Sequence, residues 1–202
     1  MAKVTPTPTM RNVALALLLA TMGSAAWAQD NPTPASSCWV ADQDSGTLGF
    51  SGVTEGRGFD GVFESFEVVV CLQGRDLTTA EIEVTVDTAS ADTDSRDRDQ
   101  TLKGEEFFFT AQFPEARWVS ATIEPQPGAF DHRAAGTLKL RDVELDQPVS
   151  MSWVEPGANP RLVGEAEIMR LDYNVGVGEF EDTDFIANEV NVEFDLGLTP
   201  AP

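Results

Sequence analysis

The feature that most constrains the fold is an alternation of apolar and polar residues with a period of two. Between residues 80 and 87, Ala80, Ile82, Val84 and Val86 alternate with acidic residues and a threonine. Successive side chains of a β-strand point to opposite faces, so this pattern gives one buried and one solvated face. Such one-sided strands are typical of antiparallel sheets.

The same alternation predicts a chain of antiparallel strands and one interruption. The phase slips between Phe63 and Phe66, which predicts a bulge or sharp bend there. Residues 89–114 are polar first and aromatic later, which predicts a short helix or lid. The predicted strands cover residues 45–53, 58–72, 79–88, 117–125, 130–141, 143–154, 161–172 and 187–197.

These strands predict an all-β fold, an extended eight-stranded antiparallel lipocalin-like barrel. Closing a sheet into a barrel removes its exposed edges, and eight strands leave an interior that side chains fill or that admits one slender ligand. A β-sandwich has the same alternation, so periodicity alone leaves that alternative open.

The first 28 residues have the form of a signal peptide. Lys3 and Arg11 precede an apolar stretch, and Ala26 and Ala28 give the small-residue pattern of a cleavage site, so we expect cleavage after Ala28. Residues 29–37 are polar and contain prolines, which predicts a flexible lead-in to a domain over residues 38–198. We therefore expect a periplasmic or secreted protein.

The two cysteines, Cys38 and Cys71, are expected to form a disulfide. Both follow the predicted cleavage site and would meet an oxidising compartment. An antiparallel hairpin of the segments 45–53 and 59–72 would bring them together near its open end. The competing interpretation of Cys38 as a lipid anchor lacks the leucine-led motif before the cysteine.

The net charge of −21 argues against a role with nucleic acid, because an acidic surface repels phosphates at long range. The composition also argues against an enzyme. The one histidine, His132, fits a turn before a strand, and Ser51 lacks the spacing of a nucleophile elbow. The acidic run 92–97 does not match a calcium loop, because Arg96 and Asp97 occupy positions that need a ligand and a glycine. We predict no catalytic residue, no metal and no cofactor.

Arg170 is the most informative charged residue. On the predicted strand 161–172 it shares a face with apolar residues such as Leu162 and Ile168. A charge that points inward needs a partner. Two partners are compatible with the sequence: a carboxylate, either Asp99 or Asp172, in an internal salt bridge, or the polar head of a bound ligand.

Several sequence blocks occur in a specific order. They are residues 39–50, which open with Trp39-Val40-Ala41-Asp42, residues 61–66, residues 82–87, residues 98–108 with Arg98-Asp99-Gln100-Thr101-Leu102, residues 113–118, residues 136–149 with Gly136-Thr137-Leu138 and Pro148-Val149, and residues 170–176. Together these blocks resemble the YceI-like, or polyisoprenoid-binding, family, and the resemblance spans almost the whole chain after the predicted signal peptide.

The resemblance implies a barrel with a tunnel for a long-chain amphiphile, such as a polyisoprenoid, an isoprenoid quinone or a fatty acid derivative, held for transport or storage. A narrow apolar cavity is also what a linear hydrocarbon chain requires. We leave open a transient membrane-protein partner and a homodimer. The predicted ligand-binding residues are Phe63, Phe66, Val68, Ile82, Val84, Trp118, Leu138, Met151, Trp153, Ile168, Arg170 and Phe194.

Two other functions remain as alternatives. A stress-protective or adhesion module without catalysis would have a barrel filled by side chains. A lipid hydrolase is disfavoured because the chain has a single imidazole.

Overall fold

A computed structural model describes Met1, residues 36–155 and residues 159–202. The predicted signal peptide and most of the predicted lead-in lie outside the described residues. The strands are β1 (Ser36–Asp42), β2 (Gly46–Thr54), β3 (Arg57–Phe63), β4 (Phe66–Gln73), β5 (Asp76–Asp87), β6 (Ala91–Asp92), β7 (Glu115–Pro125), β8 (His132–Leu140), β9 (Val143–Asp146), β10 (Val149–Val154), β11 (Arg161–Met169), β12 (Glu189–Gly197) and β13 (Thr199–Pro200).

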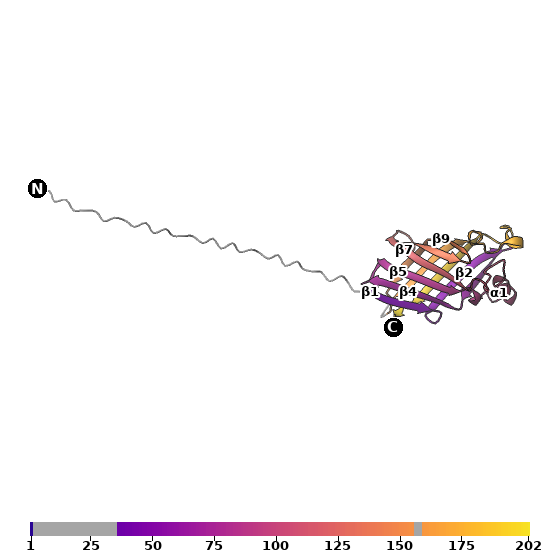
Figure 1. Ribbon diagram of the computed structural model, residues 1–202, viewed down its shortest axis with the longest axis horizontal. Helices are drawn as coiled ribbons and strands as arrows, with labels where there is room; N and C mark the ends of the chain where they lie inside the picture. Colours follow the sequence, from indigo (N-terminus) through magenta and orange to yellow (C-terminus); the bar gives the residue numbers. More distant parts are fainter. Residues whose placement is uncertain (2–35, 156–158) are drawn as a thin grey trace. The chain divides into compact units, whose positions relative to one another are not determined.

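All described strands belong to one antiparallel sheet, so the all-β prediction is confirmed and two packed sheets are not observed. The order is β13-β1-β4-β5-β7-β8-β10-β11-β12-β2-β3-β6, with β9 paired to β8. Strand β1 lies near one end of this strand order and β2 near the other, and the two strands are consecutive in the sequence. The two ends of the sheet therefore meet at residues 36–54. There β1 pairs with β4 and β13, and β2 pairs with β3 and β12. The sheet is therefore strongly curled (Figure 1).

The predicted count of eight strands is wrong, because bends divide the longer strands into shorter ones. The bend predicted between Phe63 and Phe66 is present and separates β3 from β4. The single strand predicted over 143–154 is two strands, β9 and β10, because the pairing with β8 is interrupted at Pro148, which has no N–H to donate. Strand β1 begins at Ser36, inside the predicted lead-in.

The alternation in the sequence matches the burial in the structure. In β4, Val68, Val70 and Leu72 are fully buried, Val69 and Cys71 between them are partly exposed, and Glu67 before them is exposed. The inward side chains of the sheet form a single core with residues from the segment between β5 and β7. The hydrophobic effect thus fixes which face of each strand points inward.

Four short helices complete the described chain: α1 (Arg96–Leu102), η1 (Thr88–Ser90), η2 (Arg170–Tyr173) and η3 (Gly178–Phe180). Helix α1 confirms the helix predicted within residues 89–114. It lies at one end of the curled sheet, and β1 and the C-terminus lie at the other end (Figure 1). None of the helices in the described part of the chain is long and apolar enough to cross a membrane.

The predicted disulfide is present between Cys38 and Cys71. The two residues are direct cross-strand neighbours of β1 and β4. The bond therefore fastens the first described strand to the sheet. It also indicates that the protein matures in an oxidising compartment.

Candidate ligand-binding site

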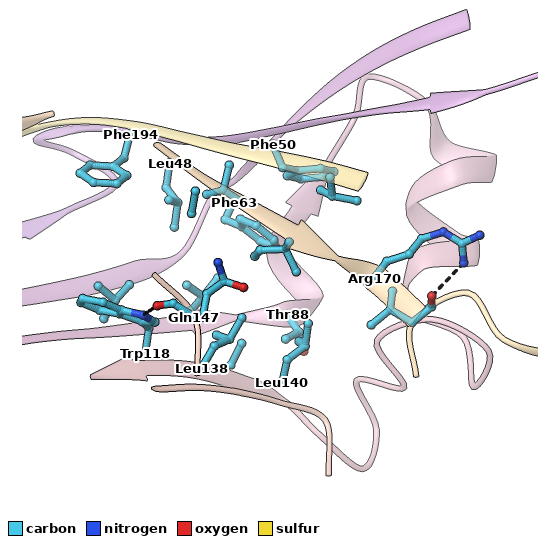
Figure 2. A pocket seen from close by; sticks show the side chains of 18 of the residues that line it. Leu48, Phe50, Phe63, Thr88, Trp118, Leu138, Leu140, Gln147, Arg170 and Phe194 are labelled. Carbon is cyan, nitrogen blue, oxygen red and sulfur yellow. Dashed lines mark hydrogen bonds between the residues drawn. The ribbon is translucent and has the colours of Figure 1, made fainter. Parts of the chain in front are cut away.

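The curled sheet encloses an apolar cavity with a volume of about 220 Å³. Strands from β2 to β12 contribute side chains to its wall, and residues of α1 and the following turn contribute at one end. Figure 2 shows aromatic and aliphatic side chains, including Phe50, Phe63 and Leu138, pointing into it from opposite sides. A cavity with such a lining favours an apolar ligand over water.

Ten of the twelve predicted ligand-binding residues line this cavity. Their contact with a ligand stays a prediction. The ten are Phe63, Val68, Ile82, Val84, Trp118, Leu138, Met151, Ile168, Arg170 and Phe194.

Phe66 and Trp153 do not belong to the cavity wall. Phe66 is buried in the core beside the bend between β3 and β4. Trp153 makes an edge-on contact with Trp39, with 6.1 Å between ring centroids, and its indole N–H points to Glu155. The alternation placed both residues on an inward face but could not show where along the sheet the cavity ends.

Sequence reasoning missed several aromatic and aliphatic wall residues. Leu48 and Phe50 belong to the predicted strand 45–53, so their alternation was a usable signal. Phe107 and Phe108 follow α1 in a turn, where no period indicates which side chains point inward. Their burial comes from the tertiary contacts of that turn.

The prediction that Arg170 pairs with a carboxylate, either Asp99 or Asp172, is wrong. Arg170 begins η2 instead of continuing β11, and its side chain is buried at 3% exposure. Asp99 instead accepts hydrogen bonds from the backbone N–H and the hydroxyl of Thr93. The carboxylate interpretation failed because sequence pattern cannot indicate backbone acceptors.

All five N–H donors of Arg170 are used by backbone carbonyls. The Arg170 Nε donates to Ala187 O at 2.9 Å, and its two terminal nitrogens donate to four further carbonyls at 2.6 to 2.9 Å. The guanidinium therefore has no N–H left for a ligand head group. Burial lowers the pKa of Arg170 from its ordinary value. The four further acceptors are the carbonyls of Val175, Gly176, Phe180 and Ile186.

A second arginine connects the same end of the sheet to the turn after α1. Arg141 donates to Phe107 O at 2.6 Å and to Asn174 O. Glu106 O accepts the backbone N–H groups of Gly176 and Val177 at 2.7 and 3.1 Å. These bonds hold residues 104–109 against residues 170–187, and both segments contribute to the cavity wall.

Among the described residues of the cavity wall, Gln147 carries the one side-chain amide, and it is 7% exposed. The Trp118 indole N–H donates to Gln147 O at 2.9 Å (Figure 2). The Gln147 side-chain Nε2 donates to Pro148 O and Glu167 O at 3.0 and 2.9 Å. This residue joins β9 to β10, and sequence reasoning did not nominate it because a polar residue next to proline is typical of a loop.

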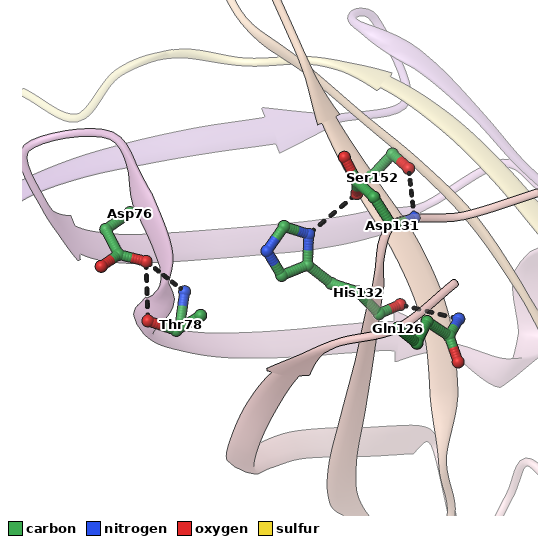
Figure 3. A network of polar contacts seen from close by, with 6 residues as sticks. All are labelled: Asp76, Thr78, Gln126, Asp131, His132 and Ser152. Carbon is green, nitrogen blue, oxygen red and sulfur yellow. Dashed lines mark hydrogen bonds and ion pairs between the residues drawn. The ribbon is translucent and has the colours of Figure 1, made fainter. Parts of the chain in front are cut away.

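The surroundings of His132 differ from a serine hydrolase site (Figure 3). His132 Nδ1 lies 2.8 Å from Asp131 Oδ1, and Ser152 Oγ accepts the Asp131 backbone N–H at 3.1 Å. Burial raises the pKa of Asp131, but hydrogen bonds from His132 and Ser152 outweigh it and hold the pKa below its ordinary value. A catalytic triad also has a carboxylate on the imidazole, but it needs the serine hydroxyl on the other ring nitrogen. Ser152 Oγ instead accepts the backbone N–H of Asp131. Across residues 36–155 and 159–202, no three His, Cys, Asp or Glu side chains are placed to hold a metal ion.

The fold and the cavity place the chain among the all-β proteins that enclose an apolar cavity in a curled antiparallel sheet. The family model described as the YceI-like domain matches residues 39–198. The chain therefore belongs to the YceI-like domain family, as its sequence blocks predict.

Two similar sequences come from bacterial relatives. A UPF0312 protein of Shewanella denitrificans is 28% identical over 142 residues, which cover 70% of this chain and 68% of the relative. Protein YceI of Salmonella arizonae is 27% identical over 119 residues, which cover 57% of this chain and 62% of the relative. The match to the Salmonella protein thus spans less than two thirds of its length.

Solved structures with the same fold include BcnA of Burkholderia cenocepacia, with a TM-score of 0.71 and 25% identity. The match covers 79% of this chain and 99% of BcnA. A polyisoprenoid binding domain of Saccharophagus degradans has a TM-score of 0.59 and 15% identity, with 80% and 98% covered. The comparison with the Saccharophagus domain shows a shared fold.

Proposed function

We propose that the chain is a periplasmic or secreted binding protein that holds a long-chain amphiphile in its apolar cavity for transport or storage. The candidate ligands are a polyisoprenoid, an isoprenoid quinone or a fatty acid derivative. The observation that carries the proposal is the apolar cavity of about 220 Å³ inside the curled sheet. Membership of the YceI-like family and the fold shared with a polyisoprenoid binding domain support it.

The pairing of the strands supports the proposed barrel. Taken together, β1 with β2, β3 with β4, β9 with β10 and β12 with β13 act as four long bent strands, and β5, β7, β8 and β11 are the other four. The long strand β1–β2 has a partner on both sides, which closes a ring of eight. A closed wall of this size encloses a narrow interior.

Burial of hydrocarbon is sufficient to give useful affinity without a charged contact. Each buried methylene contributes about 0.8 kcal/mol, so ten would contribute about 8 kcal/mol before the costs of ordering. The proposed location agrees with the disulfide and with the predicted signal peptide.

The proposal is tested by blocking the cavity with a single large side chain. Ala166 lines the cavity on β11, and its neighbour Glu167 is exposed on the outer face. Ala166→Phe should lower the uptake of an added polyprenol or quinone by about tenfold or more, which corresponds to about 1.4 kcal/mol. Glu167→Phe adds an aromatic ring to the same strand outside the cavity and should leave uptake unchanged.

Native mass spectrometry and lipid extraction after mild purification provide the readout. We expect one long-chain ligand per chain in the wild type. A ligand-free mass together with no uptake of added polyprenols or quinones would overturn the proposal. It would favour the alternative stress-protective or adhesion module, which requires an interior filled by side chains.

A further inference from the structure

Gln147 is a buried polar side chain in the wall of an otherwise apolar cavity. It is 7% exposed and lies in the link between β9 and β10. Its backbone is held on both sides, because its N–H donates to Gly136 O at 2.8 Å and its carbonyl accepts the Trp118 indole N–H. The position of the side chain is therefore set by the sheet.

The orientation of the amide is fixed by two acceptors. Nε2 donates to Pro148 O and Glu167 O at 3.0 and 2.9 Å. Both partners are carbonyl oxygens and can only accept, so the nitrogen must face them. The Oε1 atom is left on the other side of the amide, toward the interior where Phe63 and Leu138 lie (Figure 2).

No residue in the described part of the chain donates a hydrogen bond to Gln147 Oε1. A carbonyl oxygen that faces an apolar cavity without a donor costs free energy, and a bound group that supplies a donor recovers that free energy. The amide carbonyl is thus an acceptor prepared for a ligand.

The other polar groups of the wall are already satisfied or point to solvent. The Thr88 hydroxyl donates to Phe113 O and Pro114 O, and Arg170 uses all five N–H donors on carbonyls. The Arg117 guanidinium pairs with Glu83 at 2.6 Å, and its side chain is 52% exposed. Among the described wall residues, no cation is left to bind a phosphate or a carboxylate inside the cavity.

We infer that Gln147 selects a neutral long-chain ligand that carries a hydroxyl group, which donates its hydrogen bond to Gln147 Oε1. The inference rests on the proposed function and narrows its ligand class. A long-chain alcohol or a hydroquinone has the required donor. An oxidised quinone has only acceptors, and an ionised fatty acid would place an unpaired charge in an apolar cavity.

Farnesol and farnesyl methyl ether test this inference as a matched pair of ligands. The ether carries an extra methyl group, which by itself favours its burial, so a preference for the alcohol requires a hydrogen bond. The wild type should bind farnesol roughly tenfold more tightly, the scale of one net hydrogen bond, as measured by displacement of a fluorescent fatty probe.

Two variants assign the preference to Gln147. Gln147→Met keeps the length of the side chain and should abolish the discrimination between the two ligands. Leu140→Met alters another buried residue of the same cavity and should retain it. If Gln147→Met does not fold, the comparison of farnesol with its ether in the wild type still tests whether the ligand hydroxyl contributes to binding.

The outcomes separate this inference from the proposed function. Equal binding of farnesol and its ether by the wild type would overturn the role of Gln147 and leave lipid binding intact. Binding of neither ligand, with no uptake of longer polyprenols, would contradict the proposed function itself. Discrimination that persists in Gln147→Met would also overturn the inference.

Discussion

Arg170 offers a sharp prediction, because one buried side chain holds a whole segment in place. Arg170→Met removes five charged donors and leaves the carbonyls of residues 175–187 without them. A hydrogen bond from a charged group contributes about 1.5–3 kcal/mol, so five independent bonds would sum to about 7–15 kcal/mol. That sum is an upper bound, since the segment can open and let water reach its carbonyls.

We therefore expect a loss of about 3–5 kcal/mol in the free energy of unfolding, the range for breaking a buried charged network. Arg170→Lys keeps the charge but supplies at most three donors, and should fall between the wild type and the methionine variant. Arg161→Met removes an arginine that pairs with Asp195 on the surface, and should cost less than about 1 kcal/mol.

Urea unfolding followed by tryptophan fluorescence measures these losses, and amide hydrogen exchange locates them. Exchange should accelerate in residues 174–188 of Arg170→Met, while the amide of Val70 in β4 stays protected. A loss below about 1 kcal/mol in this variant, equal to that of the surface control, would refute the reasoning.

Three further predictions concern other contacts of the fold. Gly176→Ala should destabilise by at least about 1 kcal/mol, because Gly176 has φ of +72° and a Cβ there would lie 2.3 Å from Arg170 Nη1; an unchanged melting temperature would contradict this. Replacing Cys38 and Cys71 by serine removes a disulfide between residues 33 apart and should lower the free energy of unfolding in urea by about 3–4 kcal/mol. Unchanged stability after reduction of the wild-type disulfide would contradict this prediction. The pKa of Asp131 is lowered in the folded protein, so the ionised carboxylate stabilises the fold above its ordinary pKa, and this stabilisation is lost as the pH falls through the folded-state pKa. Asp131→Asn should therefore cost less than about 1 kcal/mol at neutral pH and nothing in strong acid. A cost that grows as the pH falls would contradict the sign of this argument.

The sequence was sufficient for the strands because burial on one face of a sheet is a local, periodic property. The alternation of Val68, Val70 and Leu72 predicted both the strand and the inward face, and the slip at Phe63 predicted the bend. The disulfide was predicted because both cysteines follow the expected cleavage site, and a hairpin of segments 45–53 and 59–72 allows them to meet. The strands, their inward faces and the bend depend on residues that are close in the sequence, so they can be predicted without knowledge of the fold.

The parts that could not be predicted depend on backbone groups distant in the sequence. Arg170 finds its partners among carbonyls of residues 175–187, which have no side-chain signal. Gln147 has no pattern that marks it as a wall residue, and the break at Pro148 inside the predicted strand 143–154 was not predicted. Phe107 and Phe108 become wall residues only because the turn after α1 packs against the end of the sheet.

The central claim is that a long-chain ligand occupies the interior of the curled sheet. After the expected cleavage, Met151 and Met169 are the methionines that remain. Met151 lines the cavity at 1% exposure, whereas Met169 Sδ lies 3.7 Å from Asn188 Nδ2 and is not part of the wall. Isotope-edited NMR of the two labelled methyl groups with a bound polyprenol should show contacts from the ligand chain to the Met151 methyl. Contacts to Met169 alone, or to neither methyl while the ligand is bound, would contradict the claim.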